Sequence, residues 1–141
     1  MDQEILVKGP LTKEMIQEGE KFIRYVDELS DLEVHAYFWM YYVEADDWYL
    51  VVASPEVQTK GPGEVYKKLQ AVFAKIPEGQ TIMTLEDVAA LGTYNRVVKA
   101  LKKTFKKSQK GIRLKKYGLN GYFMEDGYLY EVRKKYKSRR K

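Results

Sequence analysis

The sequence predicts an α+β domain: an antiparallel sheet built from a central hairpin and a C-terminal three-stranded meander, with about three helices. Three observations lead to this fold class. Apolar residues recur at helical spacing in three segments. Two runs rich in aromatic and β-branched residues flank a polar turn at 44–47. Asn120-Gly121 and Asp126-Gly127 are pairs that favour two-residue hairpin turns.

The first predicted helix covers residues 11–30. Thr12 is a suitable N-cap, because its hydroxyl can accept a hydrogen bond from a free N–H of the first turn. The apolar stripe consists of Met15, Ile16, Phe22, Ile23, Val26 and Leu29. Gly19 lies on this stripe, so we expect another element to approach the helix closely there.

The central hairpin is predicted from residues 34–43 and 48–53. Alternation divides the first run into one face with Phe38 and Met40 and another with Tyr37 and Trp39. Since both faces are apolar or aromatic, we expect the hairpin to lie within a sheet that is covered on both sides. A second helix is predicted between Gly61-Pro62-Gly63 and Pro77, because proline suits a first turn and stops a helix further on.

Residues 81–91 are ambiguous. The segment 84–101, Thr-Leu-Glu-Asp-Val-Ala-Ala-Leu-Gly-Thr-Tyr-Asn-Arg-Val-Val-Lys-Ala-Leu, resembles a helix-turn-helix, and with residues 76–79 it is similar to the DNA-binding segment of alkylguanine-DNA alkyltransferase-like proteins. The resemblance implies that Arg96, Lys99 and Lys103 face DNA, with the hairpins at Asn120 and Asp126 as wings. The Pro-Cys-His-Arg active-site motif of those enzymes is missing. The alternative, favoured by the shortness of residues 85–91, is a strand over 82–88 before a basic helix.

That basic helix is predicted over residues 94–108, capped by Thr93. Its apolar stripe is Tyr94, Val97, Val98, Leu101 and Phe105, and its other face is lysine-rich. The meander then follows as strands 112–119, 122–125 and 128–133. Alternation places Ile112, Leu114, Phe123, Tyr128, Tyr130 and Val132 on one face. The other face carries Arg113, Lys115, Tyr117, Tyr122, Met124, Leu129 and Glu131.

The 141 residues suit one domain, which we place at 1–132 with a basic flexible tail at 133–141. The net charge of +5 conceals a division along the chain. Residues 1–95 have 8 basic and 17 acidic side chains, a net charge of −9, whereas residues 96–141 have 17 basic and 3 acidic side chains, a net charge of +14. Such a cationic segment is typical of proteins that contact phosphate.

The sequence therefore favours non-enzymatic binding of nucleic acid of unknown type. Lysine and arginine would contact the backbone, and Tyr117 and Tyr122 would stack on unpaired bases or, alternatively, pack against another element. The predicted contact residues are Arg96, Lys99, Lys103, Lys106, Lys110, Arg113, Lys115, Tyr117 and Tyr122.

Two other functions stay open. The acidic and basic parts could dock on partners or on copies of the chain, giving a homo-oligomer. A metal-dependent nuclease could use Glu44, Asp46 and Asp47, although three acids in a hairpin loop more often form a solvated turn. We assign no catalytic residue, metal site or cofactor. The chain has no cysteine, and its single histidine, His35, is interpreted as a hydrogen-bonded structural residue.

No membrane partner is expected. The longest apolar stretch, residues 34–43, is far shorter than the roughly 20 residues of a membrane-spanning helix. The first ten residues include Asp2 and Glu4 and do not have the pattern of a signal peptide, so a cytoplasmic location is the expectation.

Overall fold

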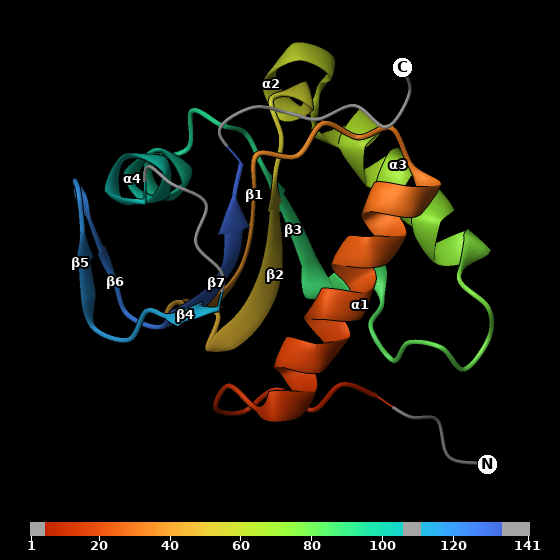
Figure 1. Cartoon of the computed structure of the whole chain (residues 1–141), viewed down its shortest axis with the longest axis horizontal. Coiled ribbons are helices and arrows are strands. Elements are labelled where there is room, and N and C mark those ends of the chain that lie inside the picture. Colours follow the sequence, from red (N-terminus) through yellow and green to blue (C-terminus); the bar gives the residue numbers. More distant parts are fainter. Residues whose placement is uncertain (1–4, 106–110, 134–141) are drawn as a thin grey trace.

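The computed structural model describes residues 5–105 and 111–133 of the chain. Within these ranges the chain forms four α-helices, seven strands and one short 3₁₀ helix, η1. In order the elements are α1 (Lys13–Leu29), β1 (Ala36–Tyr42), β2 (Asp47–Ala53), α2 (Glu56–Lys60), α3 (Pro62–Lys75), η1 (Leu85–Asp87), β3 (Val88–Leu91), α4 (Arg96–Thr104), β4 (Ile112–Arg113), β5 (Tyr117–Leu119), β6 (Tyr122–Met124) and β7 (Gly127–Val132). Figure 1 shows their arrangement.

The main sheet has five strands in the order β3-β2-β1-β7-β4, which makes the predicted hairpin of β1 and β2 internal to it. The α+β class is confirmed, but a purely antiparallel sheet was the wrong expectation. β3 runs parallel to β2, with Leu50 opposite Val88 and Ala53 opposite Leu91. The reason is the long connection through α3, which returns the chain to the starting end of β2. α2, a five-residue helix after Pro55, is the helix that the sequence pattern did not predict.

The predicted three-stranded meander does not form. β5 and β6 pair only with each other, across the expected Asn120-Gly121 turn with Gly121 at φ 94°, while β7 pairs with β1 and β4. Gly127 is not part of a hairpin turn. A Cβ at this position would come within 2.9 Å of the Trp39 carbonyl oxygen, so this glycine permits the close approach of β7 to β1.

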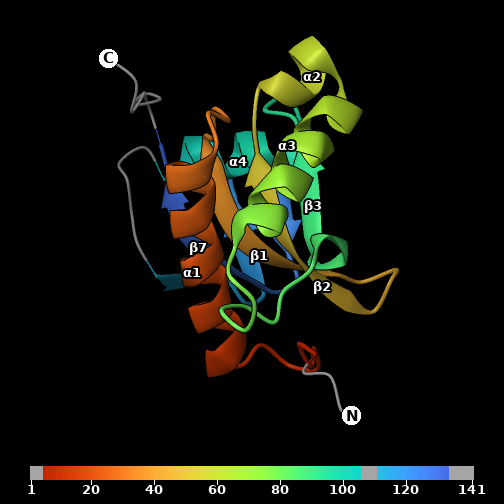
Figure 2. The ribbon, with the colours of Figure 1, turned by 90° about the vertical axis from the view of Figure 1, so that its right-hand side faces the viewer.

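The sheet separates two apolar cores. α1 and α3 cover one face, and α4 with the β5–β6 hairpin covers the other (Figures 1 and 2). β1 contributes side chains to both cores: Tyr37 and Trp39 belong to the first core and Phe38 to the second. All three side chains are fully buried, which confirms the expected two-sided cover of the hairpin.

α1 lies against the sheet at Gly19. Thr12 caps this helix as predicted, accepting a hydrogen bond from the N–H of Met15 at 3.0 Å. A Cβ on Gly19 would collide with the Tyr130 hydroxyl, and the indole Nε1 of Trp39 lies beside it. The Tyr130 hydroxyl donates to the carbonyl oxygen of Ile16 at 2.6 Å, and Trp39 Nε1 donates to that of Met15 at 3.1 Å. The expected close approach at Gly19 is thereby confirmed.

A bulge in β7 changes which side chains face α1. The register with β1 shifts between Tyr37 and Phe38, so that Tyr37 lies opposite Glu131 but Phe38 lies opposite Leu129. The extra residue, Tyr130, belongs to the first core, whereas Leu129 and Val132 both belong to the second. The simple alternation that grouped Tyr130 with Val132 was therefore wrong.

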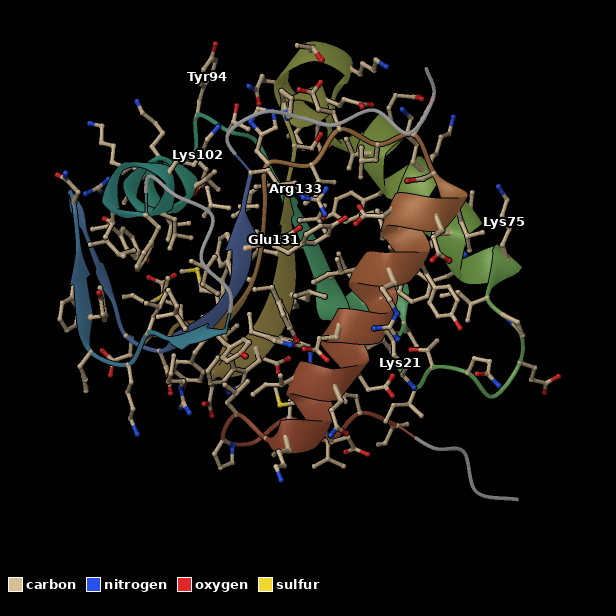
Figure 3. All side chains as sticks on the ribbon, viewed as in Figure 1. Lys21, Lys75, Tyr94, Lys102, Glu131 and Arg133 are labelled. Carbon is tan, nitrogen blue, oxygen red and sulfur yellow. The ribbon has the colours of Figure 1, made fainter. Side chains whose placement is uncertain are left out.

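Arg133, at the start of the predicted tail, is tied to the sheet. Its guanidinium forms two hydrogen bonds to Asp27 of α1, at 3.2 and 2.8 Å, and lies over the ring of Tyr37. Figure 3 shows Arg133 beside Glu131, its second carboxylate partner. The rest of the predicted tail, residues 134–141, lies outside the described ranges.

One side of the sheet ends at β3. The N–H of Ala90, in the middle of this edge strand, donates a hydrogen bond to the hydroxyl of Tyr66 at 2.9 Å. Tyr66 belongs to α3, so its side chain joins this helix to the edge of the sheet.

Candidate functional site

α4 begins two residues later than its apolar pattern suggests. Asn95, not Thr93, is the N-cap, and its side-chain oxygen accepts hydrogen bonds from the N–H groups of Val97 and Val98 at 2.9 and 3.4 Å. The preceding segment is the strand β3, not the first helix of a helix-turn-helix. A strand does precede the basic helix, but the expected bounds 82–88 were wrong: β3 covers 88–91, and residues 85–87 form η1.

The inner side of α4 packs on the sheet. Val97, Val98, Ala100 and Leu101 are all buried in the second core. The outer side carries three exposed cations at helical spacing of three and four residues, Arg96, Lys99 and Lys103. We call these three residues the α4 cationic row. At 1.5 Å per residue the row extends over about 10 Å of the helix.

The α4 cationic row has no carboxylate partner among the described residues. Its helix contains no acidic residue. Elsewhere in the described chain, basic side chains commonly form ion pairs. Examples are Lys8, Lys21, Lys60, Lys67, Lys68, Arg113, Lys116 and Arg133. The positive charge of α4 is therefore not neutralised within the part of the fold that the structure describes.

Tyr94 stands immediately before α4 and is 76% exposed. The helical pattern placed it on the buried stripe, and that expectation was wrong, because Tyr94 precedes the cap and is outside the helix. Its hydroxyl forms no hydrogen bond with a described residue. Figure 3 shows the side chain pointing away from the protein. Recognising Asn95 as the better cap would have identified Tyr94 as a loop residue.

Lys102 differs from the row because it points toward the sheet. Its Nζ lies 2.8 Å from Nδ1 of His35, whose Nε2 is 2.9 Å from a carboxylate oxygen of Glu33. Burial lowers the pKa of Lys102 below its ordinary value, against the opposing effect of Glu33. His35 thus bridges two side chains, in agreement with a structural role for this histidine.

The same end of the sheet holds a buried carboxylate, Glu56. It accepts hydrogen bonds from Lys68 Nζ at 2.7 Å and from the N–H of Glu33 at 2.9 Å. Burial raises the pKa of Glu56, but Lys68, the Glu33 N–H and Lys60 together bring it below its ordinary value. Glu56 is therefore a charged anchor that joins α2 and α3 to the segment before β1.

The remaining predicted contact residues are not grouped with the α4 cationic row. Arg113 forms two 3.0 Å hydrogen bonds to Asp126, and Lys115 borders a cavity lined also by Asp46, Glu125 and Asp126. In Figure 1, β4 lies at the lower end of the sheet and α4 at the upper end. Lys106 and Lys110 lie outside the described residues.

The two predicted stacking tyrosines face inward. Tyr117 and Tyr122 are half buried and pack against the second core, with the Tyr117 ring 6.1 Å from that of Phe105. This matches the alternative of a packing role. The outer face of the hairpin carries Phe123 instead, which is 58% exposed.

The acidic turn between β1 and β2 does not form a set of metal ligands. Asp46 accepts a 2.5 Å hydrogen bond from the Tyr41 hydroxyl, and Asp47 forms an ion pair with Lys8 at 3.5 Å. Throughout residues 5–105 and 111–133, no three histidine or acidic side chains are placed to hold a metal ion.

No helix in the described ranges is long and apolar enough to cross a membrane. Comparisons with family models, with curated proteins and with solved structures found no match to this chain.

Proposed function

We propose that this protein binds nucleic acid through the α4 cationic row. The observation that carries the proposal is the absence of carboxylate partners for Arg96, Lys99 and Lys103 within the described fold, on a helix without an acidic residue. Lysine and arginine that contact phosphates release condensed counterions, and this release drives binding. The inner side of α4 is buried, so the helix presents its charges from a fixed position.

Contacts of this kind are mostly independent of sequence. A surface of lysine and arginine side chains positions a nucleic-acid backbone, whereas base-specific contacts need groups that reach the base edges. We therefore expect similar affinity for oligonucleotides of different sequence, and affinity that falls as salt increases.

The first prediction concerns the row itself. In the triple variant Arg96→Ala, Lys99→Ala, Lys103→Ala, we expect weaker binding to fluorescent oligonucleotides and a smaller dependence on salt. The slope of log affinity against log salt should decrease by about 0.7 to 0.9 for each phosphate contact removed. Fluorescence anisotropy over a series of salt concentrations measures both quantities.

α1 supplies matched controls. Lys13 and Arg24 are exposed cations on the helix that covers the other face of the sheet. The double variant Lys13→Ala, Arg24→Ala should bind like the unmodified protein. A loss per removed charge as large as that in the triple variant would show that net charge and not α4 governs binding. Undetectable binding of the unmodified protein at low salt would overturn the proposal.

Self-association through acidic and basic surfaces is the competing function. It predicts a molecular mass, measured by light scattering, that is higher at low salt than at high salt without any nucleic acid. The nucleic-acid proposal predicts a mass that does not depend on salt.

A further inference from the structure

Tyr94 adds an exposed aromatic ring to the positive charges of the proposed interface. An aromatic side chain that is 76% exposed contributes little to folding, and no described residue uses its hydroxyl. It lies two residues from Arg96, at the end of α4 where the cationic row begins. In Figure 3 the labelled Tyr94 extends outward next to α4, from which side chains with nitrogen tips also project.

We infer that the ligand is single-stranded nucleic acid, with an unpaired base stacked on Tyr94 and the backbone along the α4 cationic row. The inference rests on the proposed function. Exposed aromatic rings bind bases of single strands because every base has a face for stacking, whereas the bases of a duplex are already stacked on one another. A cationic helix alone does not distinguish single-stranded from duplex nucleic acid. The exposed ring of Tyr94 beside it favours the single strand.

A lipid surface is the other anionic partner that such a helix could meet. Helices that lie on membranes insert an apolar face among the lipids. The apolar face of α4 is unavailable, because Val97, Val98 and Leu101 are buried against the sheet. The arrangement therefore favours nucleic acid over a membrane.

The test compares three ligands of equal length: oligothymidine, the same strand with abasic sites throughout, and a duplex. The abasic strand keeps the phosphates and removes the bases. We expect the unmodified protein to bind oligothymidine more tightly than the other two. Tyr94→Ala should weaken oligothymidine binding about 5- to 140-fold, which corresponds to 1–3 kcal/mol for one stacked base. Its affinity for the abasic strand should not change.

Tyr94→Phe separates stacking from hydrogen bonding. The phenyl ring still stacks, so we expect binding within about twofold of the unmodified protein, a small fraction of the stacking energy. If Tyr94→Phe is as weak as Tyr94→Ala, the hydroxyl binds the ligand and the stacking inference is wrong. Phe123→Ala removes another exposed aromatic ring and should leave binding unchanged; an equal loss there would overturn the assignment to Tyr94.

Failure of the inference can be distinguished from failure of the proposed function. Equal affinity of Tyr94→Ala and the unmodified protein for oligothymidine, with a loss in the triple variant of the row, would remove only the inference. No binding to any of the three ligands would remove both. Vesicles containing phosphatidylserine provide the last comparison, and Tyr94-dependent binding to them as tight as to oligothymidine would identify a lipid surface instead.

Discussion

Gly19 shows how one missing side chain determines where a helix lies. It lets the Tyr130 hydroxyl and the Trp39 indole reach the carbonyl groups of α1, which hold the helix against the sheet. The position of this glycine on an apolar stripe predicted the contact. Its two partners could not be predicted, because they come from strands 20 and 111 residues away in the chain.

Replacing Gly19 with alanine should destabilise the protein. The added methyl group would displace Tyr130, and overpacking of this kind costs about 1–3 kcal/mol. Unfolding in urea, followed by tryptophan fluorescence, measures the change. Gly63→Ala is the control: Gly63 also lies in a helix, and a Cβ there meets nothing within 4 Å. A loss no larger for Gly19 than for Gly63 would contradict the packing argument.

At the scale of elements, α4 depends on its cap. Asn95 accepts hydrogen bonds from two N–H groups of the first turn. Asn95→Ala should cost about 0.5–2 kcal/mol of unfolding free energy, whereas Asn95→Ser, which retains a capping oxygen, should cost less. Thermal unfolding followed by circular dichroism compares the two variants with the unmodified protein. If Asn95→Ala is as stable as the unmodified protein, the cap does not contribute to stability.

Elements with their own periodicity were predictable, and pairings between distant strands were not. α1, α3 and the β1–β2 hairpin follow from local apolar patterns and from residues such as Thr12 and Pro62. The sequence pattern did not reveal β3, because the four residues Val88–Leu91 are too few to show the apolar periodicity of a strand or of a helix. The C-terminal strands were misassigned because Asp126-Gly127 has the composition of a hairpin turn, while its glycine is needed for contact with β1.

The candidate site was predicted in part. The cations of α4 were identified because helical spacing alone separates them from the apolar stripe. Tyr94 was missed because the same spacing assigned it to the core. Tyr117 and Tyr122 were included among the contact residues, but their side chains are half buried against the second core. Their burial depends on the β5–β6 hairpin folding onto α4, where the Thr104 hydroxyl accepts a hydrogen bond from the Asn120 N–H at 2.8 Å. That tertiary contact leaves no local signal.

For the whole molecule, two buried carboxylates make stability depend on pH. Burial raises the pKa of Glu18, but Lys21, the Ile82 N–H and Thr81 bring it below its ordinary value of 4.5, and Glu56 is lowered in a similar way. Because the pKa in the folded state is lower than in the unfolded state, their contribution is present above pH 4.5 and is lost as pH falls through the folded-state pKa.

We therefore expect the melting temperature to fall as pH decreases below about 4.5. In Glu56→Gln the protein should be less stable at neutral pH, and its melting temperature should fall less steeply in acid. Glu64→Gln, at an exposed position of α3, should keep the profile of the unmodified protein. Scanning calorimetry over a pH series measures these profiles, and parallel profiles for Glu56→Gln and the unmodified protein would contradict the role given to Glu56.

The hydrogen bond between Tyr66 and Ala90 has a consequence for association between molecules. An edge strand with free N–H groups is a template on which a strand of another chain can add, and this addition is how sheets aggregate. The hydroxyl of Tyr66 already occupies the N–H in the middle of β3. A helix side chain thereby removes one of the outward-facing donors that a strand of another copy would need in order to pair with β3.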